Sequence, residues 1–166
     1  QSLMEGQFKP SILIVDDELS IRESFSLILE DKYKVLLSAS GESALKKIVD
    51  EKVDLVYLDI RMPGMDGMEA LKKMMKLDKD ITVIMVTAVN DVSKASEAVK
   101  LGAKDYIVKP FDVGSILSLT ENIIKKRKFA EEKREIIGIG ELEKAAEIVG
   151  RSNAIAEIIS LVDKIA

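Results

Sequence analysis

The chain has 166 residues, of which 47% are hydrophobic and 33% are charged. This composition excludes a disordered polymer, and no apolar run approaches the ~18 residues that a membrane span requires. With 25 Lys and Arg against 29 Asp and Glu, the net charge of −4 is opposite to that of a general binder of DNA phosphates. Cys and His are absent, which excludes disulfides, thiolate or imidazole metal sites and Ser-His-Asp catalysis. The absence of disulfides and of a signal peptide favours the cytoplasm.

Five short apolar runs predict β-strands. They cover residues 11–15, 34–38, 54–58, 81–86 and 105–108. Four of these runs are nearly continuous in apolar residues, which is typical of strands covered on both faces of a parallel sheet.

Amphipathic stretches between these runs predict helices. Two capping boxes, Ser20-x-x-Glu23 and Asp66-x-x-Glu69, predict the starts of the first and third helices. Single residues bound the others: Ser40 before the second helix, Gly102 as a left-handed stop after the fourth, and Asp112 before the fifth. Strict alternation of strands and helices predicts an α/β fold with a doubly wound sheet and right-handed crossovers. Such folds bind ligands at the carboxyl ends of their strands.

The fifth helix has no stop signal before Gly138. Apolar residues seven apart, Ile123, Ala130 and Ile137 with Phe129 and Ile136, form a short two-heptad seam, and a solvated helix joining two domains is the alternative. Gly138, Gly140 and Gly150 then interrupt a polar stretch. We therefore expect a disordered N-terminus or appended remnant at 1–8, a domain at 9–124, a linker at 125–150 that begins as an extended helix, and the start of a further module at 151–166.

Acidic residues follow two of the predicted strands. Asp16 and Asp17 close the first strand, and Asp59 closes the third. Adjacent carboxylates repel each other and resist burial, so this placement points to a hard cation, with helix capping by one Asp as the alternative. If strands one and three are neighbours, as in the flavodoxin-like order, the three carboxylates converge on one crevice. Such a site suits Mg²⁺.

Two further polar residues mark the same edge of the sheet. The fourth strand ends at Thr87 and the fifth at Lys109, which supply a hydroxyl donor and a cation. A phosphoryl group in transfer needs such groups on its equatorial oxygens. Asp59 can then attack phosphorus as a carboxylate nucleophile and form an acyl phosphate.

These motifs resemble the receiver domain of bacterial two-component response regulators over residues 9–124. The matching residues are Asp16-Asp17, Asp59 with Met62-Pro63-Gly64-Met65-Asp66-Gly67 after it, Thr87-Ala88 and Lys109-Pro110-Phe111. The resemblance implies a flavodoxin-like five-stranded parallel sheet of order 2-1-3-4-5.

The same resemblance implies residue roles. Asp59 is expected to be the phosphoacceptor, and Asp17, Asp59 and the main-chain carbonyl of Arg61 are expected to bind Mg²⁺ directly. Asp16 is expected to act through a water molecule. Thr87 and Lys109 are expected to contact the phosphoryl group, Tyr106 to be the rotating switch aromatic, and the Lys109-Pro110 bond to be cis.

The C-terminal residues Ile148-Val149-Gly150-Arg151-Ser152 resemble the opening of the AAA+ ATPase module in sigma-54-dependent activators of the nitrogen-regulatory type. Asn153 stands where that family usually has Pro. The sequence contains no G-x-x-x-x-G-K-[ST] motif, so this fragment is expected neither to hydrolyse ATP through that module nor to bind DNA.

The leading hypothesis is a signalling switch rather than an enzyme. A histidine kinase would donate the phosphoryl group in trans, and a homodimer would form through the fourth helix, fifth strand, fifth helix and linker, with no membrane partner. One alternative is a phosphatase of the haloacid-dehalogenase type, although its nucleophile would lie in a D-x-D motif on the first strand. The other is an unphosphorylated scaffold.

Overall fold

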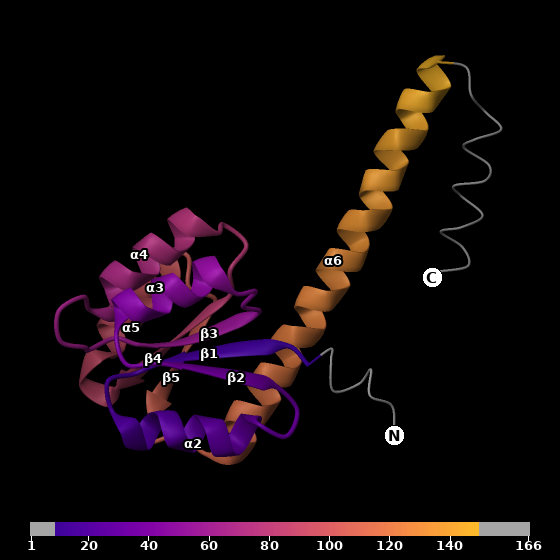
Figure 1. The fold of residues 1–166 in the computed structure, drawn as a ribbon. Helices are drawn as coiled ribbons and strands as arrows, with labels where there is room; N and C mark the ends of the chain where they lie inside the picture. The colour runs from indigo at the N-terminus through magenta and orange to yellow at the C-terminus, as the bar shows by residue number, and fades with distance from the viewer. Residues whose placement is uncertain (1–8, 150–166) are drawn as a thin grey trace. The chain divides into compact units, whose positions relative to one another are not determined.

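The computed structural model describes the backbone of residues 9–149 and the side chains of residues 9–133. Strands and helices alternate along this part of the chain (Figure 1). The strands are β1 (Ser11–Val15), β2 (Lys34–Ser38), β3 (Leu55–Asp59), β4 (Val83–Ala88) and β5 (Asp105–Lys109). The helices are α2 (Leu19–Leu29), α3 (Gly41–Asp50), α4 (Gly67–Leu77), α5 (Val92–Lys100) and α6 (Val113–Val149), with a 3-10 helix η1 (Val89–Asp91) before α5. None of these helices combines the length and apolarity that a membrane crossing requires.

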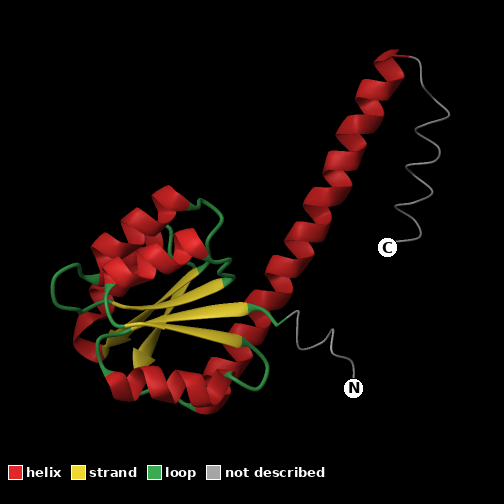
Figure 2. Cartoon of the chain, in the orientation of Figure 1, coloured by secondary structure: helices red, strands yellow, loops and turns green. Residues whose placement is uncertain are grey.

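All five strands pair in parallel in the order β2-β1-β3-β4-β5, which confirms the predicted flavodoxin-like sheet. Helices cover both of its faces (Figure 2). The central strands β1, β3 and β4 are almost completely buried, whereas the edge strands β2 and β5 are largely half-exposed. Continuous apolar runs therefore mark the centre of the sheet, and the edges tolerate polar residues because one side of each edge strand lacks a neighbour.

Two clusters of apolar side chains fill the space between sheet and helices. One cluster joins α3, α4 and α5 to the sheet and includes Val56 and Met74. The other lies on the opposite face, where α2 and the first turns of α6 pack through Phe25, Tyr57 and Ile116 (Figure 1). The sheet is therefore the middle layer of three, as a doubly wound fold requires.

The predicted strands three, four and five end slightly too early. β3 extends to Asp59, β4 runs from Val83 to Ala88, and β5 extends to Lys109. Because these ends carry the polar residues, Asp59, Thr87 and Lys109 lie within the strands rather than in the loops after them. Their backbones are held by the sheet.

The predicted helix starts hold at α3 and α4 but not at α2. Ser40 accepts a hydrogen bond from the Ser43 amide, and Asp66 accepts one from the Glu69 amide. The capping box at Ser20 is wrong, because α2 begins at Leu19 and Ser20 lies inside the helix.

Helix α6 continues through Gly138 and Gly140 to Val149. These two glycines therefore do not end the helix, in contrast to what the sequence suggested. A glycine in the interior of a helix lowers its stability by only about 1 kcal/mol relative to alanine. A single glycine therefore does not have to end a helix. One compact unit ends at Ile124, and a second begins at Lys125. Ile123 is buried in the core of the first unit, so it is not free to join a coiled-coil seam. The parts expected at 1–8 and 151–166 lie outside the described residues.

Candidate functional site

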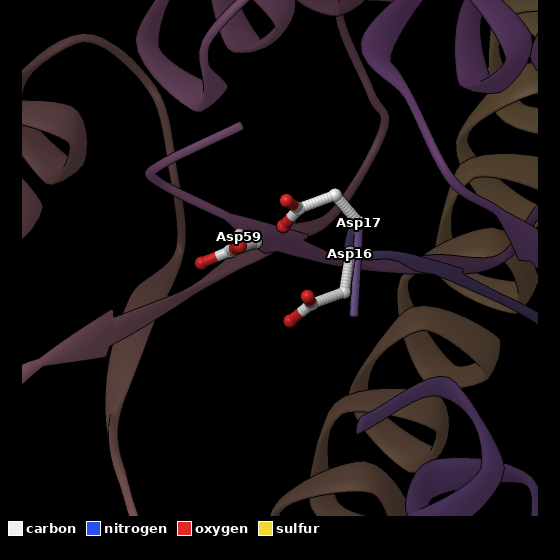
Figure 3. Close-up of side chains that lie close together, drawn as sticks. All are labelled: Asp16, Asp17 and Asp59. Carbon is white, nitrogen blue, oxygen red and sulfur yellow. The ribbon is translucent and has the colours of Figure 1, made fainter. Parts of the chain in front are cut away.

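Three carboxylates meet at the carboxyl edge of the sheet, as predicted. Asp16, Asp17 and Asp59 each offer an oxygen within 4.8 Å of the others. Asp16 and Asp59 are buried, with 2% and 6% of their surface exposed, whereas Asp17 is exposed. Figure 3 shows that all three carboxyl groups turn to the same side of the strand ends. The pairing of β1 with β3 brings them together, since Asp16 and Asp17 follow β1 directly and Asp59 ends β3.

Lys109 binds this cluster from the end of β5. Its Nζ donates to Oδ2 of Asp16 at 3.0 Å and to Oδ1 of Asp59 at 3.4 Å. Burial alone would lower the pKa of Lys109, but its hydrogen bond to Asp16 and the nearby charges together raise it. The ammonium group is therefore fully charged at neutral pH. The Lys109-Pro110 bond after it is cis, as expected.

The carboxyl group of Asp59 is electrostatically unfavourable when ionised. Burial, followed by the charge of Asp16, raises its pKa from 3.8 to about 7, against the opposing effect of Lys109. One ammonium group does not neutralise the three carboxylates, and the ionised cluster carries an excess of two negative charges. Hard divalent cations prefer such oxygen ligands, so the cluster fits a cation of the Mg²⁺ class.

Asp16 also contacts the turn that leads into α2, although it does not cap that helix as the capping alternative expected. Its Oδ1 accepts a hydrogen bond from the amide of Glu18, the residue before α2, while its carbonyl oxygen accepts one from Arg22. This carboxylate therefore orders the turn before α2, where Glu18 holds the cap position without a side-chain cap bond. Asp16 both orders the β1–α2 turn and faces Lys109.

Two glycines shape the loop between β3 and α4. A Cβ on Gly67 would lie 2.2 Å from the carbonyl oxygen of Asp59, so only glycine allows the helix to start this close to the strand. The amide of Gly67 donates to the carbonyl of Ile60 at 2.7 Å, which closes the loop. Gly64 has a φ of 74°, which favours glycine. The motif after Asp59 thus fixes the main chain beside the carboxylate.

The other predicted site residues lie on the neighbouring strands. Thr87 is buried near the end of β4, where its hydroxyl donates to the carbonyl of Ala88 at 3.0 Å. Tyr106 is half-buried on β5 and packs against the core cluster of α3, α4 and α5.

Sequence reasoning missed the side-chain partner of Arg61. Its Nε and a terminal nitrogen donate to the two carboxylate oxygens of Asp91 at 2.5 and 2.7 Å. This hydrogen bonding raises the pKa of Arg61 and lowers that of Asp91. The two residues are 30 positions apart, and no local pattern in the sequence pairs them.

A depression of about 440 Å³ opens beside this pair rather than over the carboxylate cluster. It is lined by Ile60, Arg61, Met62, Pro63, Gly64, Asp66, Met68 and Lys94. The lining comes from the loop after β3, the start of α4 and one lysine of α5, so the depression neighbours the site without containing Asp59.

The fold and the acidic edge define a class of molecule: a doubly wound α/β domain with three carboxylates and one lysine gathered at the carboxyl edge of its sheet. Comparison with known proteins agrees with this class. The family model of the response regulator receiver domain matches residues 12–121. The chain belongs to that family.

Two curated relatives illustrate its range. The chemotaxis protein CheY of Listeria monocytogenes is 41% identical over 69% of this chain and 98% of its own length. The nitrogen assimilation regulatory protein NtrX of Azorhizobium caulinodans is 32% identical over 93% of this chain, but this match spans only 34% of NtrX. A crystal structure of NtrX from Brucella abortus with ADP superimposes with a TM-score of 0.73 at 30% identity, covering 78% of this chain and 30% of that one.

Receiver domains are signalling switches rather than turnover enzymes. The phosphatase alternative is therefore not supported. The order of the acidic residues agrees, since the lone Asp59 lies on β3 and the adjacent pair follows β1.

Proposed function

We propose that this protein is a phosphorylation-dependent switch that accepts a phosphoryl group on Asp59. The observation that carries the proposal is the position of this carboxyl group, buried at the end of β3, in contact with Lys109 and beside Asp16 and Asp17. A buried carboxylate in such an acidic cluster costs stability, because the single ammonium group of Lys109 does not offset its burial and the charge of Asp16. The placement of Asp59 in this cluster supports a chemical role.

Mg²⁺ is the proposed cofactor. Asp17, Asp59 and the main-chain carbonyl of Arg61 would bind it directly, and Asp16 would bind through water. When bound, the ion would neutralise the phosphoryl oxygens and the carboxylates as they approach each other.

The phosphoryl donor is proposed to be a histidine kinase acting in trans, since this chain has no histidine. An oxygen of Asp59 forms a bond to phosphorus while the bond from phosphorus to the imidazole nitrogen breaks. The leaving imidazole keeps the electron pair and takes a proton from water. Lys109, whose Nζ lies 3.4 Å from Oδ1 of Asp59, would bind an oxygen of the transferred group.

The response is proposed to follow from the new dianionic group. Thr87 would turn its hydroxyl from the carbonyl of Ala88 towards the phosphoryl oxygens, and Tyr106 would rotate into the space vacated. This change would repack the face formed by α5, β5 and α6, which biases a two-state equilibrium.

We propose that this face supports a homodimer. Val99, Leu101 and Val113 are exposed apolar residues on or beside α5 and α6, and Phe129 is 68% exposed further along α6. Because the chain spans about a third of NtrX, we further propose that the switch regulates a downstream ATPase module of the sigma-54 activator type. This fragment would bind no nucleic acid, and its expected cytoplasmic location stays a prediction.

The chemical proposal is tested by intact mass after incubation with acetyl phosphate and Mg²⁺. We expect one added phosphoryl group in the wild-type protein and none in Asp59→Asn or in excess chelator. Asp54→Asn is the matched control, because Asp54 precedes the same strand and accepts a hydrogen bond from the Ser11 amide, away from the site. Labelling of Asp59→Asn would place the phosphoacceptor elsewhere. Continued consumption of acetyl phosphate in large excess would restore the phosphatase alternative, and no reaction at all would favour the scaffold.

The proposed output is tested by sedimentation with and without a beryllofluoride mimic of the phosphoryl group. We expect the association state to change when the mimic is bound. An unchanged association state and unchanged scattering profile, with the mimic demonstrably bound, would contradict the proposed dimer response.

A further inference from the structure

An ion pair links the two connections that flank the carboxylate cluster. Arg61 lies in the loop after β3, and Asp91 ends the 3-10 helix η1 after β4. The guanidinium group donates from two nitrogens to the two carboxylate oxygens, at 2.5 and 2.7 Å. This two-point contact fixes orientation as well as distance, because the planar guanidinium matches the carboxylate.

The two partners differ in their exposure. The Asp91 side chain is only 7% exposed, whereas that of Arg61 is 69% exposed. A buried carboxylate without a partner is costly, so Asp91 retains Arg61 more strongly than a surface residue would. Asp91 occupies the cap position of α5 but makes no side-chain cap bond there. Its carboxylate therefore serves the contact with Arg61 rather than the start of the helix.

The main chain directly before Arg61 is tied to β4 and to the start of α4. The amide of Ile60 donates to the carbonyl of Val86 on β4, and the carbonyl of Ile60 accepts from Gly67. Arg61 is two residues after Asp59, and Asp91 is four residues after Thr87. The ion pair is thus a side-chain contact that joins the loop after Asp59 to the segment that leads into α5.

We propose that Asp91 is a positioning residue that holds Arg61, and so presets the main-chain carbonyl of Arg61 for the metal ion and couples that carbonyl to the start of α5. The inference rests on the proposed function, since it assigns the carbonyl of Arg61 to Mg²⁺. Ordering of the loop by the metal then orders η1 and α5, and by linkage a displaced α5 weakens metal binding.

The test compares Mg²⁺ affinity by calorimetry in three variants. Arg61→Lys keeps the charge but loses the two-point contact, while Arg61→Gln and Asp91→Asn remove the pair with opposite changes of charge. We expect each variant to weaken Mg²⁺ binding, by about tenfold for Arg61→Gln and Asp91→Asn, the lower end of the range for groups that orient metal ligands. The double variant Arg61→Gln with Asp91→Asn should bind no more weakly than either single variant.

The direction of the change in Mg²⁺ affinity distinguishes a positioning role from a purely electrostatic one. Coulomb's law alone predicts that removing the cation of Arg61 strengthens Mg²⁺ binding and that Arg61→Lys changes nothing. That pattern would overturn the inference. Glu69→Gln is the control for charge, because Glu69 is an exposed residue of α4 paired with Lys73 at 3.6 Å. It removes the same charge as Asp91→Asn and should leave the affinity within about twofold.

A second measurement needs no metal. Amide hydrogen exchange of the metal-free protein should speed up in residues 61–66 and in residues 89–93 together, in both Arg61→Lys and Asp91→Asn. Faster exchange confined to the mutated segment would contradict the coupling. Failure of the wild-type protein to bind Mg²⁺ would overturn the proposed function and this inference alike. Normal wild-type binding and labelling with unchanged variants would overturn the inference alone.

Discussion

Strand β3 carries two buried polar side chains whose environments differ sharply. Tyr57 and Asp59 are two residues apart and lie on the same face of the strand by alternation. The hydroxyl of Tyr57 bonds to Thr120 of α6 at 2.6 Å in an apolar core. The carboxyl group of Asp59 instead faces two other carboxylates and a single ammonium group.

One of these two environments stabilises the folded domain, and the other destabilises it. The Tyr57–Thr120 pair is neutral and fully hydrogen-bonded, so it fixes α6 on the sheet at little electrostatic cost. The cluster around Asp59 is charged and unbalanced, and it becomes favourable only with an added cation or phosphoryl chemistry. Tyr57, which has a structural role, and Asp59, for which we propose a chemical one, are thus only about 6–7 Å apart along the strand.

The largest expected effect comes from removing the positive charge beside Asp59. Lys109→Met removes the ammonium group that Asp16 and Asp59 share, and we expect a loss of about 3–5 kcal/mol in the free energy of unfolding at pH 8 with chelator present. The loss should shrink at pH 5, because Asp59 is then protonated. Urea unfolding at both pH values measures it.

The matched control is the same substitution at an exposed ion pair. Lys34 lies 3.4 Å from Glu51, and both side chains are well exposed. Lys34→Met should cost less than about 1 kcal/mol at either pH. Equal losses for the two variants would mean that the buried carboxylates do not depend on Lys109.

Removing the unfavourable charge should have a smaller effect of opposite sign. The pKa of Asp59 is about 7 in the folded protein against an ordinary value of 3.8, so the folded state keeps a proton that the unfolded state has released. Stability of the metal-free wild-type protein therefore falls as pH rises through this interval. Asp59→Asn has no such proton, and we expect it to be about 2–4 kcal/mol more stable than the wild type at pH 8 and no more stable at pH 4.

Urea unfolding with chelator at the two pH values measures this difference. Asp54→Asn, at the other end of the strand, should show no gain at pH 8. Mg²⁺ should also stabilise the wild-type protein but not Asp59→Asn, since ligands that bind only the folded state shift its stability. A gain for Asp59→Asn that is the same at pH 4 and pH 8 would exclude charge burial as its cause.

The sequence predicted much of this charged edge because its signals are local. Continuous apolar runs marked the central strands, and the polar residue at each strand end was placed by the topology of a parallel sheet. Asp16, Asp17, Asp59 and Lys109 were therefore placed together without knowledge of any distance, and the structure confirms that they meet.

The features that the sequence did not predict depend on tertiary contacts or on competition between local signals. The Arg61–Asp91 pair joins residues 30 positions apart, and Tyr57 and Thr120 are 63 apart. Either tyrosine or threonine alone is a common residue of a strand or helix. The capping box at Ser20 failed because α2 begins at Leu19, with Glu18 in the cap position, so Ser20 already lies in the first turn.

The smallest expected effect concerns the Tyr57–Thr120 pair. We expect substitution of its two partners to cost different amounts of stability. Thr120 has one hydroxyl hydrogen, and it is donated to the carbonyl of Ile116 at 2.7 Å, so the hydroxyl of Tyr57 must donate to Thr120. Tyr57→Phe leaves Thr120 with its own bond and should cost about 1 kcal/mol, whereas Thr120→Val leaves the buried hydroxyl of Tyr57 without an acceptor and should cost about 2 kcal/mol.

The double variant separates this account from simple loss of packing. If the cost of Thr120→Val comes from an unpaired hydroxyl, adding Tyr57→Phe removes that hydroxyl and should recover part of the lost stability. Urea unfolding at pH 7 measures the stability of all three variants. Labelling by acetyl phosphate should be unchanged in each, because the hydrogen bonds that these substitutions remove do not involve the carboxylate cluster. Strictly additive losses would show that the two side chains act independently, and the contrast between Tyr57 and Asp59 would then be lost.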